Sequence, residues 1–257
     1  MDVADIPHTR KEAALFFKNY VQQNATRLAN KQVYDLSAGS GYIIGLFEQQ
    51  GAVVYPFDLF PDQVKFCKTP CRFINLQERF PIATHSADLV ISSETIEHLP
   101  NQLFFFEEVS RMLKPGGTFI LSTPNTSSLR SRYSQFVAES EHYASPLPNE
   151  HNAFTMWEGK TTGYYAKIFI SGILRLRTLA ALNQLRITEV HQTKSSSTSW
   201  LLMVFYPIIW WISKKQFKKG VANAPQQRDT LLEVFKLNTS KTVLLSRHLI
   251  IEFKKTN

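Results

Sequence analysis

Short apolar runs alternate with segments of helical periodicity over much of the chain. Apolar residues recur at helical spacing in residues 8–29, which predicts a leading amphipathic helix. Because strands then alternate with helices at a spacing that fits βαβ units, we expect a parallel sheet covered by helices on both faces. The further predicted helices are 42–50, 101–113 and 171–183, and the predicted strands are 33–36, 52–58, 73–74, 87–92, 118–122, 185–190 and 244–253.

The regular alternation stops after Pro124. Residues 125–165 are polar and rich in Ser, Asn and His, which predicts an irregular lid. A Ser/Thr linker at 194–199 leads into an apolar run, Trp200–Ile212, which is broken by Pro207. We expect a single domain over 1–257. Its predicted parts are a cofactor-binding half at 30–125, a lid and substrate region at 126–185, and an apolar and basic insertion at 195–240 before the last strand.

Composition excludes several classes of protein. With 257 residues, 44% apolar and 19% charged, the chain is not intrinsically disordered. Two cysteines exclude a disulfide scaffold and fit a reducing cytosol. No apolar stretch follows the acidic start Met1–Asp5, so we expect no signal peptide. A helix over Trp200–Ile212 would reach about 20 Å, short of the roughly 30 Å hydrocarbon core, so it can lie on a membrane but hardly cross it.

The net charge of +8 is unevenly distributed. Lys214, Lys215, Lys218 and Lys219 follow the apolar run directly. This arrangement suits an anionic membrane surface at least as well as the phosphates of a nucleic acid. We therefore expect a cytoplasmic protein that associates peripherally with the inner face of a membrane; a solvated lysine face, a buried helix and a dimer interface are the alternatives.

A glycine loop follows the first predicted strand, in the segment Asp35–Gly41. Gly39 and Gly41 lack the Cβ that would block the close approach of a ligand to backbone N–H groups. Asp58 ends the next strand, where a carboxylate can accept hydrogen bonds from both ribose hydroxyls of an adenosine. A nicotinamide dinucleotide and S-adenosylmethionine both fit. The dinucleotide fingerprint, however, requires a glycine at position 44, which is Ile44.

Two downstream segments resemble a known family. Residues 86–99 are similar to the fourth-strand segment of class I S-adenosylmethionine-dependent methyltransferases, and residues 113–120 are similar to the turn and fifth strand of that family. Asp35–Gly41 and Asp58 match its first two motifs. Within the family, the chain resembles the ubiquinone/menaquinone-type and polysaccharide-cluster small-molecule enzymes. The resemblance implies a Rossmann-like α/β fold with a mostly parallel seven-stranded sheet, a lid and a C-terminal apolar insertion.

The resemblance also implies S-adenosylmethionine as the cofactor and assigns roles around it. Asp35 would orient the loop and the cofactor amino group, and backbone carbonyls near Ser92 would meet the ammonium. Asp58 would hold the ribose, Leu59 and Leu76 would flank the adenine, and Asn75 would lie near its polar edge. Ser37 stands where the family usually has glycine. The implied cofactor-binding residues are Asp35, Ser37, Gly39, Gly41, Asp58, Leu59, Asn75, Leu76 and Ser92.

Glu94, Glu97 and His98 are the candidate catalytic residues. Their spacing i, i+3, i+4 would put them on one face of a helical turn just past the fourth strand. His98 is the candidate general base, with a carboxylate to orient it. We expect no dedicated metal site. The resemblance to ubiquinone O-methyltransferases makes these three residues the ligands if a divalent cation is required, and a purely structural role is the third interpretation.

The expected activity is methyl transfer to a hydroxyl of a small or lipid-linked acceptor, either a quinone precursor or a glycan. His142, His151 and Tyr133 lie in the predicted lid and are candidates for acceptor contact. The alternatives are an RNA methyltransferase, a non-catalytic S-adenosylmethionine-binding scaffold and, disfavoured by Ile44, a nicotinamide oxidoreductase. A nucleic-acid partner is not expected, because no RNA-recognition motif is present. The sequence does not predict the oligomeric state.

Overall fold

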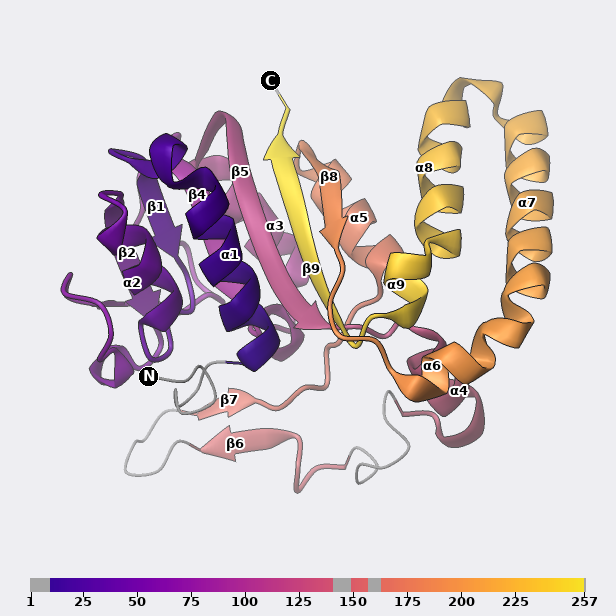
Figure 1. The fold of residues 1–257 in the computed structure, drawn as a ribbon, viewed down its shortest axis with the longest axis horizontal. Helices are drawn as coiled ribbons and strands as arrows, with labels where there is room; N and C mark the ends of the chain where they lie inside the picture. The colour runs from indigo at the N-terminus through magenta and orange to yellow at the C-terminus, as the bar shows by residue number, and fades with distance from the viewer. Residues whose placement is uncertain (1–9, 141–148, 157–162, 257) are drawn as a thin grey trace. The chain divides into compact units, whose positions relative to one another are not determined.

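The structure, a computed structural model, describes residues 10–140, 149–156 and 163–256 (Figure 1). The chain divides into two compact units. The first unit comprises Met1–Thr123, Leu179–Glu189 and Ile250–Asn257, and the second comprises Pro124–Thr178 and Val190–Leu249.

A seven-stranded sheet in the order β3-β2-β1-β4-β5-β9-β8 forms the centre of the first unit. The pairs β1–β2, β1–β4, β2–β3 and β4–β5 are parallel, whereas β9 runs against β5 and β8 (Figure 1). The expected mostly parallel seven-stranded sheet is therefore confirmed. Its strands are β1 (Gln32–Asp35), β2 (Val53–Asp58), β3 (Arg72–Phe73), β4 (Ala87–Ser93), β5 (Leu113–Pro124), β8 (Leu185–His191) and β9 (His248–Lys255).

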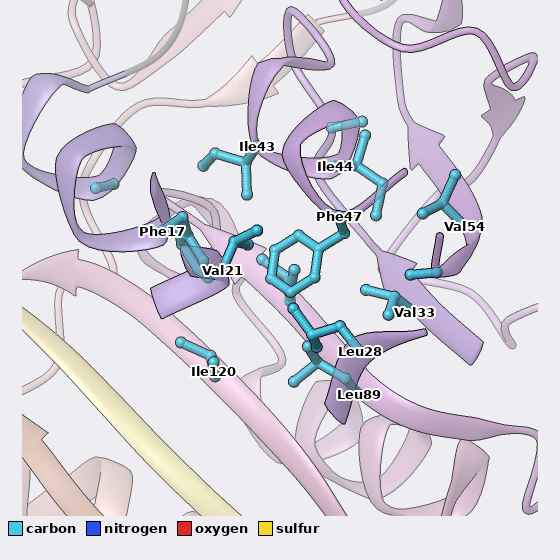
Figure 2. Packing of buried hydrophobic residues seen from close by; sticks show 14 of the residues in the cluster. Phe17, Val21, Leu28, Val33, Ile43, Ile44, Phe47, Val54, Leu89 and Ile120 are labelled. Carbon is cyan, nitrogen blue, oxygen red and sulfur yellow. The ribbon is translucent and has the colours of Figure 1, made fainter. Parts of the chain in front are cut away.

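Helices cover both faces of this sheet, as expected. The helices α1 (Lys11–Leu28) and α2 (Tyr42–Gln49) pack on one face, where Phe17 and Phe47 meet Val33 and Ile120 in an apolar cluster (Figure 2). On the other face, α3 (Gln102–Met112) places Phe106 edge-on against Phe119 and Phe253. Phe119 and Ile120 serve opposite faces because successive side chains of a strand alternate.

The second unit contains more regular structure than the sequence predicted. Residues 125–165 were expected to be irregular, but Leu129–Ala138 form α4, and β6 (Phe154–Met156) pairs with β7 (Gly163–Tyr165) as an antiparallel hairpin. The side chain of Ser128 accepts a hydrogen bond from the Ser131 N–H and so caps α4. Because this region is polar, its sequence shows no clear apolar periodicity from which the helix or the hairpin could be predicted.

The last strand was predicted over 244–253, and the predicted first residue of this strand was wrong. Lys241–Leu245 form the short helix α9, capped by the Ser240 hydroxyl, and β9 begins only at His248. Val243, Leu244 and Leu245 are all buried. A short buried apolar run has no periodicity that distinguishes a helix from a strand.

The apolar segment forms consecutive helices that Pro207 does not interrupt. The segment consists of α6 (Ser197–Leu201), the 3-10 helix η4 (Leu202–Phe205) and α7 (Tyr206–Asn223). Pro207 lies in the first turn of α7, where its missing N–H costs no helical hydrogen bond. Among the described residues, no helix is long and apolar enough to span a membrane. The remaining helices are η2 (Pro61–Gln63), η3 (Ile96–His98), α5 (Ile173–Leu182), η5 (Pro225–Gln227) and α8 (Arg228–Thr239).

Candidate active site

The candidate site is built on loops that follow neighbouring parallel strands. Because β2, β1, β4 and β5 are adjacent and parallel, their carboxyl ends meet at one edge of the sheet. Ligands in open α/β sheets bind at this edge. The predicted residues from Asp35 to His98 lie on or directly after these strands or in the segment after β3.

The glycine loop turns sharply from β1 into α2. The Ala38 N–H donates to the Phe57 carbonyl at 2.9 Å, and the Gly41 N–H donates to the Ala38 carbonyl at 2.7 Å. Gly39 and Gly41 have φ values of 53° and 82°, in the left-handed region that favours glycine. Gly41 is the residue that caps α2, so the loop delivers the chain to the start of a helix whose first N–H groups lack helical partners.

Gly45 of α2 allows the loop after β2 to pass close to the helix. A Cβ on Gly45 would lie 2.1 Å from the carbonyl oxygen of Phe66, and a Cβ on Gly41 would lie 2.6 Å from Cγ1 of Val64. The Ser40 carbonyl accepts from the N–H groups of Lys65 and Phe66 at 2.8 and 3.0 Å. No role was predicted for Gly45 from the sequence, so this close approach was missed.

Asp58 joins the end of β2 to the glycine loop. Its Oδ2 accepts from the Gly39 N–H at 2.8 Å, and its Oδ1 accepts from the Phe60 N–H, also at 2.8 Å. A carboxylate oxygen accepts more than one hydrogen bond, so both oxygens retain capacity for hydroxyl donors. The arrangement therefore fits the predicted ribose contact and adds the positioning of Gly39.

Ser37 cross-links the ends of two strands. Its Oγ accepts from the Ser93 N–H at 2.9 Å and lies 3.4 Å from the Ser93 carbonyl, to which it donates. The Ser93 and Ser122 hydroxyls are hydrogen-bonded at 2.8 Å. Ser37 is not among the residues with positive φ, so a side chain at this position causes no backbone strain. The departure from glycine thus has a structural use at the edge of the sheet.

The residues assigned to the adenine region differ in exposure. Leu76 is buried, and Leu59 and Asn75 are half-buried. The Asn75 amide nitrogen donates to Glu78 Oε1 at 2.7 Å, and its oxygen accepts from the Gln77 N–H at 3.1 Å. Ser92 is fully buried, and its Oγ has no hydrogen-bond partner within the described part of the chain.

The predicted helical turn carrying Glu94, Glu97 and His98 is not formed. Glu94 has a φ of 55° and precedes η3, a 3-10 helix of only three residues, so the expected i, i+3, i+4 face was wrong. In the part of the chain that the structure describes, the possible metal-ligand atoms of these three side chains do not all lie within 4.8 Å of one another. The left-handed turn at Glu94 had no signal in the sequence.

Each of the three residues instead has its own environment. Glu94 Oε2 forms an ion pair with Arg10 Nε at 2.7 Å. Glu97 is fully buried and accepts from the Thr123 hydroxyl at 3.0 Å. His98 ends η3 half-buried, and its backbone N–H donates to the Thr95 carbonyl at 2.9 Å. The Thr123 contact fixes the Glu97 side chain, and Arg10 neutralises the charge of Glu94.

Comparison with known proteins gives this site a family. A family model described as "Methyltransferase domain" matches residues 34–121, from β1 into β5. A probable S-adenosylmethionine-dependent methyltransferase of Mycolicibacterium smegmatis is 32% identical over 47% of this chain and 49% of its own length. A ubiquinone biosynthesis O-methyltransferase of Haemophilus ducreyi is 28% identical over 53% of this chain and 62% of its own length. The matched parts therefore span about half to three-fifths of these relatives.

A solved structure, that of an S-adenosylmethionine-dependent methyltransferase of Archaeoglobus fulgidus, shares the fold. It superposes with a TM-score of 0.54 at 13% identity, covering 94% of each chain. The fold, the geometry of the glycine loop and the family model all indicate the same family of proteins. Residues 34–121 belong to the class I S-adenosylmethionine-dependent methyltransferases.

The methyltransferase domain takes S-adenosylmethionine as its cofactor, as the sequence predicted, and the expectation of an enzyme of this class is confirmed at the level of the family. The glycine loop fits such a ligand because Gly39, at a φ of 53°, turns its backbone toward the end of β2, where Asp58 supplies acceptors beside it. The individual cofactor contacts remain predictions.

The residues proposed for acceptor contact lie in the second unit. Tyr133 lies on α4 and is half exposed, while His151 is almost fully exposed with Nε2 3.8 Å from Glu150 Oε1. His142 lies outside the described residues. Contact between these side chains and an acceptor remains a prediction.

Asp35 in the methyltransferase domain should make stability depend on pH. Burial raises the pKa of Asp35 to about 7, the Ser37 N–H lowers it, and the charge of Asp58 raises it further. Between the ordinary pKa of 3.8 and about 7, the folded protein holds a proton that the unfolded chain has lost. The free energy of unfolding should therefore fall as pH rises through this range, by at most about 1.4 kcal/mol per unit.

Asp35→Asn removes this titration but keeps an oxygen to accept from the Ser37 N–H. Urea unfolding of both proteins at about pH 5 and about pH 8 measures the effect. We expect the variant to lose less stability than the wild type between the two conditions. Equal losses in the two proteins would show that Asp35 ionises in the folded state without cost.

Proposed function

We propose that the protein transfers a methyl group from S-adenosylmethionine to a hydroxyl of a small or lipid-linked acceptor. The observation that carries the proposal is the joining of Gly39 to Asp58 in a loop suited to the cofactor. The hydroxyl acceptor is supported by the relatives named ubiquinone biosynthesis O-methyltransferase, which match at low identity. A quinone precursor and a glycan are the two acceptor classes that we favour.

The cofactor, when bound, supplies a methyl group on a positively charged sulfonium. The chain then has two tasks, which are to hold cofactor and acceptor in line and to exclude competing water. Holding the reactants together lowers the barrier by about 7–11 kcal/mol in well-oriented intramolecular reactions. The glycine loop and Asp58 would perform the first task on the cofactor side.

A hydroxyl acceptor must also lose its proton, and we propose His98 as the general base. His98 follows β4 at the edge of the sheet where ligands bind in this fold. It is half-buried, so part of the residue remains accessible. Its neighbour Glu97 is held by Thr123 at 3.0 Å and so contributes a fixed carboxylate to the same segment.

His98→Ala should lower turnover by about a hundredfold or more, because general base catalysis contributes at least that much when a proton moves in the transition state. Its affinity for S-adenosylmethionine should stay close to that of the wild type. Acceptors would first be identified by mass spectrometry of methylated products from catechol-type quinone precursors, sugar nucleotides and RNA. His85→Asn is the matched control, since His85 is an exposed histidine of the same unit and asparagine tolerates its positive φ.

Each outcome has a distinct meaning. Full activity of His98→Ala on an accepted substrate would assign the residue to structure. Loss of activity with a chelator and recovery with magnesium would support Glu94, Glu97 and His98 as metal ligands. Methylation of RNA alone, or cofactor binding without transfer to any acceptor class, would overturn the proposed function.

A further inference from the structure

A row of large apolar side chains is exposed along α6, η4 and the first half of α7. Each of the seven is between 44% and 77% exposed, although all are residues that usually avoid water. They recur one, three or four residues apart, so they follow one side of consecutive helices. We call them the outer row; they are Trp200, Leu201, Val204, Phe205, Ile208, Trp211 and Ile212.

The opposite side of α7 is already packed within the second unit. Trp210 and Phe217 both contact the ring of Phe235 on α8, and the Asn238 amide donates to the Ser213 hydroxyl at 2.8 Å. The two helices lie side by side as the two arms of a hairpin (Figure 1). The outer row therefore faces away from the partner that α7 has in this chain.

The segment that bears the outer row has one sign of charge. Residues 190–228 contain no aspartate or glutamate. Farther along α7, the positions in line with the outer row are Lys215, Lys218 and Lys219, all exposed. The ammonium of Lys215 lies 5.6 Å from the centre of the Trp211 ring. The outer side of α7 thus changes from apolar to basic along its length. The basic residues of the segment are Lys194, Lys214, Lys215, Lys218, Lys219 and Arg228.

We propose that the outer row and these lysines bind the surface of an anionic lipid bilayer. Tryptophan favours the headgroup level of a membrane, lysines are attracted to anionic headgroups, and a helix with an apolar side lies in the plane of the interface. A recess of about 780 Å³ beside the row is lined by Tyr206, Pro207, Ile208, Trp210 and Trp211, and this lining is suited to acyl chains.

Charge favours a bilayer over a second copy of the chain. In a two-fold symmetric interface the same surface meets itself, so the lysines of α7 would face a segment without any carboxylate. An anionic membrane supplies the missing negative charge. The proposal concerns attachment only and is independent of methyl transfer.

Sedimentation with lipid vesicles tests the proposal on the full chain. We expect the wild type to pellet at low salt with vesicles containing phosphatidylglycerol and phosphatidylcholine. It should remain largely in solution with phosphatidylcholine alone, or with the anionic vesicles at high salt. Brominated lipids should also quench its tryptophan fluorescence, since Trp200, Trp210 and Trp211 are three of its four tryptophans.

Two sets of substitutions separate the apolar and the charged contributions. Val204→Ser with Ile208→Ser and Trp211→Ser should abolish pelleting, whereas Leu15→Ser with Leu103→Ser and Leu182→Ser, three exposed leucines elsewhere, should not change it. Lys215→Gln with Lys218→Gln and Lys219→Gln should weaken binding about a hundredfold, because each lysine near an anionic surface contributes about fivefold. The control replaces the exposed Lys18, Lys65 and Lys254 with glutamine.

Affinity for S-adenosylmethionine, measured on every variant, reports that the fold is intact and keeps this test separate from the proposed function. A wild type that ignores anionic vesicles at low salt, and whose fluorescence brominated lipids do not quench, would overturn the proposal. So would a dimer that the outer-row substitutions dissociate, or equal loss of binding in the leucine control.

Discussion

Replacing Asp58 with alanine should weaken the binding of S-adenosylmethionine by about fivefold to somewhat more than a hundredfold. The substitution removes the acceptors for the Gly39 and Phe60 N–H groups, both held at 2.8 Å, together with the predicted acceptor for the ribose hydroxyls. Leaving a buried polar group without its partner costs about 1–3 kcal/mol, which corresponds to this range of affinity. The glycine loop should also lose its position, because Gly39 is tied to β2 through this carboxylate.

Calorimetric titration with S-adenosylmethionine and with its demethylated product measures the effect. Asp62→Ala provides the control, since Asp62 is an exposed aspartate in η2, shortly after the same strand. Its affinity for both ligands should match that of the wild type. Unchanged affinity in Asp58→Ala, or binding of NADH by the wild type in place of S-adenosylmethionine, would contradict the assigned role.

Gly45→Ala should destabilise the protein, although helix propensity predicts the opposite sign. In a helix interior, alanine is about 1 kcal/mol more favourable than glycine. At this position, however, the new Cβ would lie 2.1 Å from the backbone oxygen of Phe66. Backbone cannot rotate away as a side chain can, so α2 and the loop after β2 must separate. We expect the free energy of unfolding to fall by about 1–3 kcal/mol, the usual cost of overpacking, or by more.

Urea unfolding together with calorimetry tests this second prediction. The separation of α2 from the loop disturbs the hydrogen bonds of Lys65 and Phe66 to Ser40, so the affinity for S-adenosylmethionine should fall along with the stability. Gly51→Ala is the control. A Cβ there meets open space, and only its φ of 78° introduces strain, so stability should fall without a change in affinity. A stabilised Gly45→Ala protein would refute the argument.

The sequence alone determined the α/β class and the order of the elements in the first unit, and its resemblance to a known family indicated the cofactor. These features depend on short-range information. Periodicity distinguishes helix from strand over residues 8–122, and the glycines at 39 and 41 mark a backbone that must turn sharply. The position of Asp58 beside the glycine loop was also predictable, because neighbouring parallel strands end at the same edge of the sheet regardless of the loops between them.

Only the tertiary structure decided how the residues after β4 are arranged and which side of α7 is exposed. The left-handed turn at Glu94 places Glu94 with Arg10 and leaves Glu97 with Thr123, partners that are 84 and 26 residues away in the chain. The buried run at 243–245 forms a helix that the Ser240 side chain caps. The outer row remains exposed on α7 because α8 packs against the opposite side of that helix. Such outcomes depend on contacts between distant segments, and local patterns of apolar and polar residues carry no information about them.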